Sequence, residues 1–248
     1  MEFFTVIPEI LHLAPILPAK KFRPDILVNA AKDYAHVKNS PEFGTRKYTN
    51  PAKCVGIYEY ARYGWVLTTW QDFVIETNGD KVSFNWETPV AQDKLTNGDM
   101  TTQMIDHHSK NQYADYIGGI PESLDTVVKI NSPWRCIIPD GYFLMQGPLP
   151  HTNERRFTTA TGFLSNDFGI TQMNVQLFWH VLNGRTVVKA GTPIAHYMLI
   201  PKDQPDMSVG VASEEFIAKS KAAQLEMTRR NITDHKESKC VFAKILKG

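Results

Sequence analysis

The sequence has few cysteines, almost no net charge and no long hydrophobic run. Its three cysteines, Cys54, Cys136 and Cys240, are widely separated, and no Cys/His spacing typical of a zinc site occurs. Reduced thiols favour a reducing compartment, so we do not expect secretion. The net charge of +1 provides no global field to attract nucleic acid or a membrane surface. No apolar run approaches the length needed to cross a bilayer.

The apolar start of the chain, MEFFTVIPEILHLAPILPAKKF, does not have the pattern of a signal peptide. It carries Glu2 in place of a positively charged leader, and Pro8, Pro15 and Pro18 interrupt it. We therefore predict an extended arm or strand over residues 1–20, in which the prolines exclude a helix.

Short apolar and aromatic runs cut by turn residues are abundant, above all between residues 127 and 201. Pro-Asp-Gly, Asn-Asp-Phe-Gly, Asn-Gly and Ala-Gly separate these runs. This pattern is typical of antiparallel strands joined by tight turns. We predict a mainly β (α+β) fold in which this stretch folds back on itself as a jelly-roll or β-clip-like barrel or sandwich, with a few short helices.

A hairpin and an irregular connection precede that stretch. Residues 65–86 are predicted to form strands, with a turn at Asn78 and Gly79 between alternating apolar positions. Residues 88–125 have no sustained period. A connection of this length is uncommon unless it packs or functions, so a lid over a pocket is one possibility for it.

Helical spacing predicts short helices over residues 24–37 and 53–62, and a longer helix over 213–230. In the long helix Ser213 can cap the N-terminus, and acidic residues in the first turn and Arg229 and Arg230 in the last suit the helix dipole. A narrow apolar stripe indicates a helix that lies on a surface or against a partner. The stripe consists of Phe216, Ala223 and Met227, flanked by Ile217 and Leu225. We predict one β-rich domain over residues 1–208, followed by a helix and tail over 209–248.

Part of the β-rich stretch resembles the β core of dUTPase and dCTP-deaminase-type proteins. The resemblance is carried by residues 138–142, 162–169 and 189–195, less than a third of the chain. It implies a barrel whose second segment forms a nucleoside-binding loop. Ser165 stands where the family has its catalytic aspartate, and no Pro-Arg-Ser phosphate-binding segment is present. Since a hydroxyl alone cannot activate water at neutral pH, Asp167 would have to act as the base.

Most of residues 50–202 resembles an uncharacterised family common in tailed-phage genomes, including marine ones. The shared elements are Lys-Cys-x-Gly-Ile at 53–57, Gly-Trp-Val-x-x-x-Trp at 64–70 and Asn-Ser-Pro-Trp at 131–134. The resemblance implies a virus-encoded protein, located in the cytoplasm of the infected cell or in the virion. It implies self-association or other viral proteins as partners, and it assigns neither an activity nor a cofactor.

Two aromatic–polar pairs and one carboxylate are the candidate ligand-binding residues. In Trp134-Arg135 and in Trp179-His180, strand alternation places one member inward and the other outward. A tryptophan buried in the core is one interpretation, and a stacking surface for a base, sugar or peptide is the other. Asp167, in the loop of the nucleotide-enzyme resemblance, completes this set.

His151, Glu154 and His196 are candidate metal ligands. A cupin-type site uses two histidines and a carboxylate on one strand pair and a further histidine on a later strand. Asn153 stands where the second histidine of that motif would be, so solvent-exposed or strand-face histidines are the alternative. Asp106-His107-His108 is interpreted as a polar loop without a partner cluster.

Three functions therefore remain open. The first is a non-catalytic, virus-encoded β module that binds or packs against partners. The second is an enzyme of nucleotide metabolism on a dUTPase-like or deaminase-like barrel, and the third is a cupin-like metalloprotein. Because no catalytic constellation is complete in the sequence, no reaction is assigned.

Overall fold

The computed structural model describes the chain except for residues 23–24, 38–49, 51–53, 91–102, 168 and 234–248. The chain divides into two compact units. Unit 1 comprises residues 1–24 and 59–203, and unit 2 comprises residues 25–58 and 204–248. All described strands belong to unit 1, and helix α3 (Val55–Arg62) crosses the boundary between the units.

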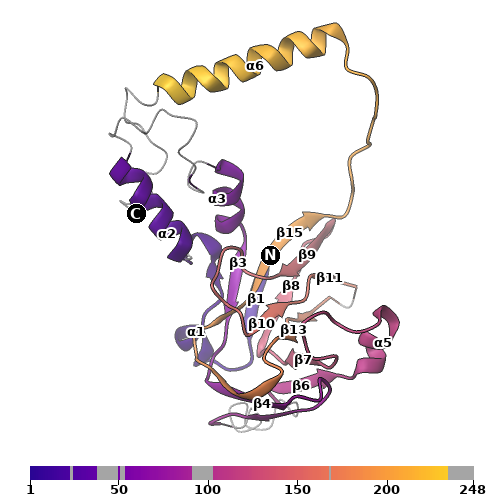
Figure 1. Cartoon of the computed structure of the whole chain (residues 1–248). Coiled ribbons are helices and arrows are strands. Elements are labelled where there is room, and N and C mark those ends of the chain that lie inside the picture. The colour runs from indigo at the N-terminus through magenta and orange to yellow at the C-terminus, as the bar shows by residue number, and fades with distance from the viewer. Residues whose placement is uncertain (23–24, 38–49, 51–53, 91–102, 168, 234–248) are drawn as a thin grey trace. The chain divides into compact units, whose positions relative to one another are not determined.

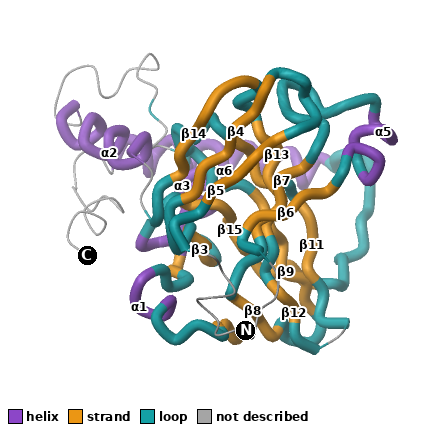
Figure 2. The backbone as a smooth tube through the Cα atoms, turned by 90° about the horizontal axis from the view of Figure 1, so that it is seen from below, coloured by secondary structure: helices purple, strands orange, loops and turns teal. Residues whose placement is uncertain are grey.

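Unit 1 is mainly β, as predicted, and consists of four antiparallel sheets (Figures 1 and 2). Their strand orders are β1-β8-β12, β10-β13-β7-β6, β11-β9-β15-β3-β2 and β14-β4-β5. Within the described residues each sheet keeps two edge strands. The strands of the first half are β1 (Glu2–Thr5), β2 (Leu17–Pro18), β3 (Trp65–Thr68), β4 (Phe73–Asn78), β5 (Phe84–Glu87), β6 (Ile105–His108) and β7 (Val127–Ile130). Those that follow are β8 (Trp134–Ile137), β9 (Tyr142–Gly147), β10 (Phe157–Thr159), β11 (Gly162–Leu164), β12 (Thr171–Gln172), β13 (Val175–Trp179), β14 (Asn183–Val188) and β15 (Pro193–Pro201).

The stretch from 127 to 201 is antiparallel β structure, but its strands do not pair only with one another. In every sheet at least one partner comes from outside the stretch: β8 pairs with β1, β7 with β6, β15 with β3, and β14 with β4. Long-range pairing of this kind leaves no trace in local hydrophobic periodicity, which is why the sequence pattern did not indicate it.

The N-terminal segment contains the expected strand β1, but also one helical turn, α1 (Ile10–Leu13). The expectation that prolines exclude a helix here was wrong. Pro8 lies before the helix, where its missing N–H is not needed, and the turn is complete before Pro15. The amide of Ala14 donates to the Ile10 carbonyl at 3.0 Å, and the buried Ile10 side chain joins the main core.

The hairpin of β4 and β5 is confirmed, with Thr77 opposite Phe84 and Ile75 opposite Trp86. Its turn is longer than the Asn-Gly pair alone would give. The Asp80 carboxylate accepts the backbone N–H groups of Val82 and Ser83, both at 2.7 Å, and so delays the second strand until Phe84. These two hydrogen bonds, that from Ser83 first, lower the pKa of Asp80 to about 2.

Residues Asp106 to His108 belong to strand β6, so their interpretation as a polar loop was wrong. Ile105, at the start of β6, is fully buried and lies opposite Ile130 of β7. Asp106 faces Lys129 across the strand pair, with 3.7 Å between the carboxylate and the ammonium group. Beyond β6 the chain forms the short helices η3 (Lys110–Gln112) and α5 (Ala114–Ile117).

The main core of unit 1 receives apolar side chains from all four sheets. It also contains one buried polar chain, in which the Tyr197 hydroxyl donates to Gln146 Oε1 at 2.9 Å and Gln146 Nε2 donates to Gln176 at 3.2 Å. Burial raises the pKa of Tyr197, and burial raises the pKa of the Cys136 thiol to about 11. Both groups are therefore neutral packing elements at physiological pH.

The predicted helices are confirmed as α2 (Asp25–Val37), α3 and α6 (Glu214–Thr233). Ser213 caps α6 as predicted, because its hydroxyl accepts the amide of Phe216 at 3.2 Å. A further 3-10 turn, η1 (Ala19–Lys21), follows β2. Among the described residues, no helix combines the length and the apolar character that a bilayer span requires. The final segment, with Cys240, lies outside the described residues.

Candidate functional site

The segment that follows the last strand has an unusual surface. From residue 204 to residue 226, every side chain is exposed. We call this segment the C-terminal arm; it consists of an extended stretch, 204–213, and the described side chains of α6. In the extended stretch Met207, Val209 and Val211 are 86%, 87% and 101% exposed. This alternation of apolar residues is that of a strand with one apolar face.

Helix α6 continues this apolar surface. Phe216, Ile217 and Leu225 are all exposed large apolar residues, and Phe216 exposes 63% of its surface. Glu214 and Glu215 occupy the first turn, and Glu215 forms an i,i+4 ion pair with Lys219 at 2.7 Å. Phe216 and Ile217 are adjacent and lie about 100° apart around the helix, whereas Leu225 lies about 180° from Phe216, on the other side. A helix gains most of its stability from packing apolar side chains, and those of α6 are exposed on more than one side.

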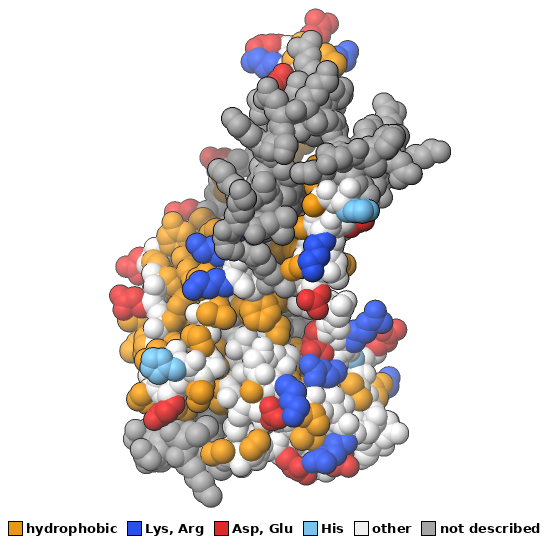
Figure 3. All heavy atoms as spheres, turned by 90° about the vertical axis from the view of Figure 1, so that its left-hand side faces the viewer, with side chains coloured by type: hydrophobic (Ala, Val, Ile, Leu, Met, Phe, Trp, Pro, Cys, Tyr) orange, Lys and Arg blue, Asp and Glu red, His pale blue; other side chains and the backbone are white. Residues whose placement is uncertain are grey.

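Unit 1 also exposes apolar side chains away from its core. Figure 3 shows hydrophobic side chains gathered on the face turned to the left in Figure 1, the side on which α1 lies. Leu11 and Leu13 of α1 are exposed, although their neighbour Ile10 is buried. On α5, Tyr116 is 83% exposed. Exposed apolar patches of this kind mark contact surfaces when they are contiguous.

A third apolar feature lies on the outer face of the five-stranded sheet. Phe143 of β9 and Phe163 of β11 are stacked, with ring centroids 5.2 Å apart, and the Lys202 ammonium group lies 5.1 Å from the Phe143 centroid. Phe163 is 60% exposed. The pair can therefore add a further planar group to its stack.

The predicted ligand-binding residues do not form one cluster. Trp134 and Trp179 both belong to the main core, whereas Arg135 is half-buried between β1 and β12. One guanidinium nitrogen of Arg135, Nη1, is buried and has no hydrogen-bond partner. No hydrogen bond, ion pair or ring contact joins any two of these residues, or joins one to Asp167 or His180, in the described part of the chain. Their role in binding stays a prediction.

His180, which follows β13, joins the loop at residues 122–123 to strand β10. Its Nδ1 lies 3.0 Å from the Glu122 carbonyl oxygen and 2.8 Å from the Ser123 hydroxyl, and its Nε2 lies 2.7 Å from the Thr158 hydroxyl. Because a carbonyl oxygen can only accept, the hydrogen bond to Glu122 requires the proton on Nδ1. Nε2 then has no proton and accepts the hydrogen bond from the Thr158 hydroxyl. Glu122 has a φ of 53°, so this bond holds a backbone position that is costly for a residue with a side chain.

The chemistry of this arrangement is that of an oriented imidazole next to a hydroxyl. Thr158 is exposed, and its proton points to a base whose other nitrogen is fixed by a carbonyl. Sequence reasoning missed Ser123 and Thr158, because they lie 57 and 22 residues from His180 and belong to no motif. Of the residues in this arrangement, the sequence indicated only His180.

Asp167 lies beside a polar network that joins two of the three segments of the nucleotide-enzyme resemblance, 138–142 and 162–169, with Lys202. The Ser165 hydroxyl donates to Asp167 at 2.7 Å. The neighbouring Asn166 donates to Asp140 at 2.9 Å and accepts from Lys202 at 3.1 Å. Strands β9, β11 and β15 are adjacent in one sheet, which is why these loops meet. A carboxylate therefore does lie beside Ser165, as an enzyme of that type would require.

The three candidate metal ligands have different surroundings. His151 is exposed and has a φ of 60°, which places it in a tight turn. His196 is buried, and its Nε2 donates to the Tyr63 carbonyl at 2.5 Å; burial lowers its pKa, against the effect of that hydrogen bond. Glu154 is bound by Arg156. Among the described residues no three His, Cys, Asp or Glu side chains are close enough to share a metal ion, so the metal hypothesis gains no support here.

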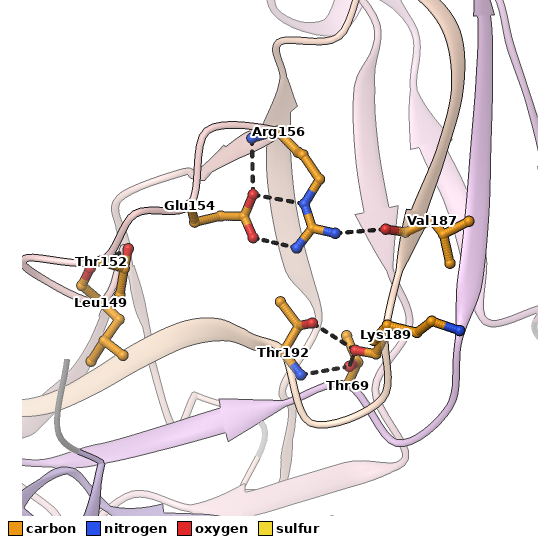
Figure 4. A network of polar contacts seen from close by, with 8 residues as sticks. All are labelled: Thr69, Leu149, Thr152, Glu154, Arg156, Val187, Lys189 and Thr192. Atoms are coloured by element: carbon orange, nitrogen blue, oxygen red, sulfur yellow. Dashed lines mark hydrogen bonds and ion pairs between the residues drawn. The ribbon is translucent and has the colours of Figure 1, made fainter. Parts of the chain in front are cut away.

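Glu154 and Arg156 form a structural clasp on unit 1 (Figure 4). The carboxylate accepts from the Arg156 amide at 2.9 Å, from its Nε at 2.8 Å and also from its Nη2, while Nη1 donates to the Val187 carbonyl at 2.6 Å. Below it, the Lys189 carbonyl accepts the hydroxyls of Thr69 and Thr192 at 2.8 and 2.6 Å. The two groups of bonds fix the end of β14 and the turn that follows it.

The clasp predicts a change of stability with pH. Burial raises the pKa of Glu154, but the hydrogen bonds and charge of Arg156 outweigh it and hold the pKa below its usual value of 4.5. The stabilisation by the ionised Glu154 is therefore fully present above pH 4.5, and it is lost as the pH falls through the lower pKa that Glu154 has in the folded state. We expect Glu154→Gln to lower the free energy of unfolding by about 1–2 kcal/mol near pH 7, and by much less near pH 3.

Urea unfolding of both proteins at the two pH values measures this difference. Glu87→Gln is the matched control, because the Glu87–Arg185 pair is exposed on both sides and should contribute less than about 0.5 kcal/mol. A Glu154→Gln effect that stays constant with pH would show that the ion pair does not stabilise the fold.

A shallow pocket of about 260 Å³ is lined by Lys20, Glu59, Arg62 and Tyr63. None of the predicted site residues lines the pocket. His196 is connected to it only through the hydrogen bond of its Nε2 to the carbonyl of Tyr63, which is a lining residue. Its two basic side chains and one acidic side chain define no specific ligand.

No family model and no curated protein matches the sequence. The class that the fold and its surface define is a mainly β protein with four antiparallel sheets and an exposed, apolar C-terminal arm.

Proposed function

We propose that this protein is a virus-encoded accessory or virion-associated β protein that acts by binding and packing, and that its C-terminal arm is the binding element. The observation that carries the proposal is the uninterrupted exposure of residues 204–226, with large apolar side chains at regular positions. The phage-family resemblance of residues 50–202 supports the viral origin and a location in the infected cell or the virion. We also propose that the four sheets are a variant of a jelly-roll or β-clip architecture.

The arm carries enough apolar surface to drive association. Full burial of one Val, Leu, Met or Phe side chain contributes about 1.5–3 kcal/mol. Loss of free motion on association costs about 4–15 kcal/mol. Burial of the arm's five most exposed large apolar side chains therefore contributes an amount of the same order as that cost. These side chains are Met207, Val209, Val211, Phe216 and Leu225.

Removing the apolar character of the arm is expected to abolish association. In the full chain, the variant Val209→Asp/Val211→Asp/Phe216→Asp should sediment as a monomer, while the unchanged protein sediments as an oligomer or as a complex with a virion protein. The three positions are exposed, so the thermal unfolding of the protein should not change. Sedimentation velocity over a wide concentration range makes the measurement.

The control is Ser208→Asp, which adds one negative charge on the other side of the extended stretch, where no large apolar side chain lies. It should leave association unchanged. An unchanged protein that is monomeric at every concentration, and that binds no virion protein, would contradict the proposal.

An enzyme of nucleotide metabolism is the second candidate. The contact between Ser165 and Asp167 favours it, because it supplies the carboxylate that such an enzyme needs beside that hydroxyl. A screen of thermal unfolding with nucleoside triphosphates separates the two functions. A bound nucleotide at about 100 times its dissociation constant stabilises the fold by about 2.7 kcal/mol. If the protein acts only by binding and packing against partners, nucleotides should not stabilise the fold in this screen.

A further inference from the structure

One face of the sheet β10-β13-β7-β6 carries a hydroxyl, an imidazole and an aromatic ring side by side. Thr158 of β10 lies opposite Phe178 of β13, so their side chains point to the same face of the sheet. His180 lies two residues beyond Phe178 and stays paired with the β10 side, because its amide donates to the Arg156 carbonyl at 2.8 Å. Its imidazole reaches the Thr158 hydroxyl with Nε2 at 2.7 Å. Strand pairing therefore brings the hydroxyl and the imidazole together.

This imidazole is held in the tautomer in which it acts as a base toward Thr158. Nδ1 donates to the Glu122 carbonyl at 3.0 Å and lies 2.8 Å from the Ser123 hydroxyl, so the free electron pair is on Nε2. The loop that provides the carbonyl is itself anchored, because the Leu124 amide donates to the Trp179 carbonyl at 2.8 Å. In serine hydrolases a carboxylate orients the imidazole at the same nitrogen. A carbonyl gives the orientation without the negative charge, so we expect the same chemistry at a lower rate.

Of the two hydroxyls beside His180, only that of Thr158 is accessible to a substrate. Thr158 is exposed, whereas Ser123 is fully buried. Among the strands that the structure describes, β10 is at the edge of its sheet, so a substrate can approach it from the open side. The Thr159 amide points to that edge, since the next amide, that of Ala160, donates across to β13 at 2.8 Å. The amide beside the hydroxyl can thus donate to an oxygen on which negative charge develops.

An apolar surface lies next to the same hydroxyl. The Tyr113 ring packs on Phe178 with the ring centroids 5.5 Å apart, and Phe178 is the cross-strand neighbour of Thr158. Phe178 is half-buried against Ala114, Ile120 and Val127, and Tyr113 is 42% exposed. The two rings offer an uncharged acyl chain a contact surface beside the oxygen that would attack it.

We propose that Thr158 and His180 form an acyl-transfer site that hydrolyses esters with an apolar acyl group, an activity independent of the C-terminal arm. The Thr158 oxygen adds to the ester carbonyl carbon while Nε2 of His180 accepts its proton. The bond to the leaving alcohol breaks, His180 returns the proton to the alcohol oxygen, and the acyl group stays on Thr158 as an ester. Water, deprotonated by the same nitrogen, then adds to the acyl carbon, and Thr158 recovers its proton as the carboxylic acid leaves.

The test treats the full-length protein with p-nitrophenyl butyrate, follows p-nitrophenolate release and locates the acyl group by peptide mass spectrometry. The unchanged protein should carry the butyryl group on Thr158. Thr158→Val should lose the adduct, and Thr158→Ser should keep it. His180→Gln should slow acylation at least roughly 100-fold, because the base is lost. Thr161→Val makes the same change at another exposed threonine and should behave like the unchanged protein.

The acyl surface is tested by the length of the acyl chain. The butyrate should acylate Thr158 faster than p-nitrophenyl acetate, and Tyr113→Ala should reduce that preference without slowing the acetate. Thermal unfolding shows which variants are folded, and mapping of the adduct on the unchanged protein depends on no variant. Absence of an acyl group on Thr158, or acylation that a folded His180→Gln variant leaves unchanged, overturns the acyl-transfer site. Equal rates with the two esters overturn the acyl surface. None of these results touches the proposed role of the arm, which sedimentation tests separately.

Discussion

Replacing Trp179 with alanine is expected to lower the free energy of unfolding by about 3–5 kcal/mol. Trp179 ends strand β13, is fully buried, and stacks on Phe157 of β10 with ring centroids 6.1 Å apart. It is the largest of the fully buried side chains in the described part of unit 1. Its removal leaves a cavity that the surrounding sheets cannot close without breaking strand register, so the transfer and cavity costs add.

Urea unfolding followed by far-ultraviolet circular dichroism measures this loss without relying on the tryptophan itself. Trp179→Phe should cost less, because it keeps an aromatic ring and removes an indole N–H that is buried without a partner. Tyr116→Ala, at an exposed aromatic position, should change the free energy of unfolding by less than about 0.5 kcal/mol. A loss below about 1 kcal/mol for Trp179→Ala would mean that this side chain is not part of a packed core.

Much of the fold could be predicted because its signals are local. The Asn78-Gly79 turn and the alternation on either side predicted the hairpin, and Ser213 predicted the start of α6. The errors arose where a local rule met a longer-range contact. Strand β6 forms because the backbone of Ile105 to His108 pairs with β7, although its side chains are mostly polar. Propensity gives no information on such pairing.

The candidate sites were less predictable than the fold, because they depend on which loops meet. The Ser165–Asp167 contact is local, yet its connection to Asp140 and Lys202 follows only from the order of β11, β9 and β15. The partners of His180 could not be found without the structure. For the C-terminal arm the sequence indicated a narrow apolar stripe on the helix, but not the exposed alternation of Met207, Val209 and Val211 before it.

A methyl group added at Gly64 is expected to destabilise the protein far more than one added at Gly79. Both glycines have left-handed backbone angles, with φ of 80° and 89°, so alanine at either position costs about 1–2 kcal/mol in backbone strain. At Gly79 the new Cβ meets nothing within 4 Å. At Gly64 it would lie 2.0 Å from the carbonyl oxygen of Tyr197, in the central strand of the five-stranded sheet.

The clash at Gly64 cannot be relieved by a side-chain rotation, because the contacted atom is backbone. Either β15 or the segment between α3 and β3 must move, and the Gly64 carbonyl also accepts the Ala19 amide at 2.8 Å. We therefore expect Gly64→Ala to lower the free energy of unfolding by at least about 3 kcal/mol, against about 1–2 kcal/mol for Gly79→Ala. Parallel urea unfolding of the two variants measures the difference. Equal losses at the two glycines would show that Gly64 and β15 do not approach as closely as the structure places them, since backbone strain alone would then account for both.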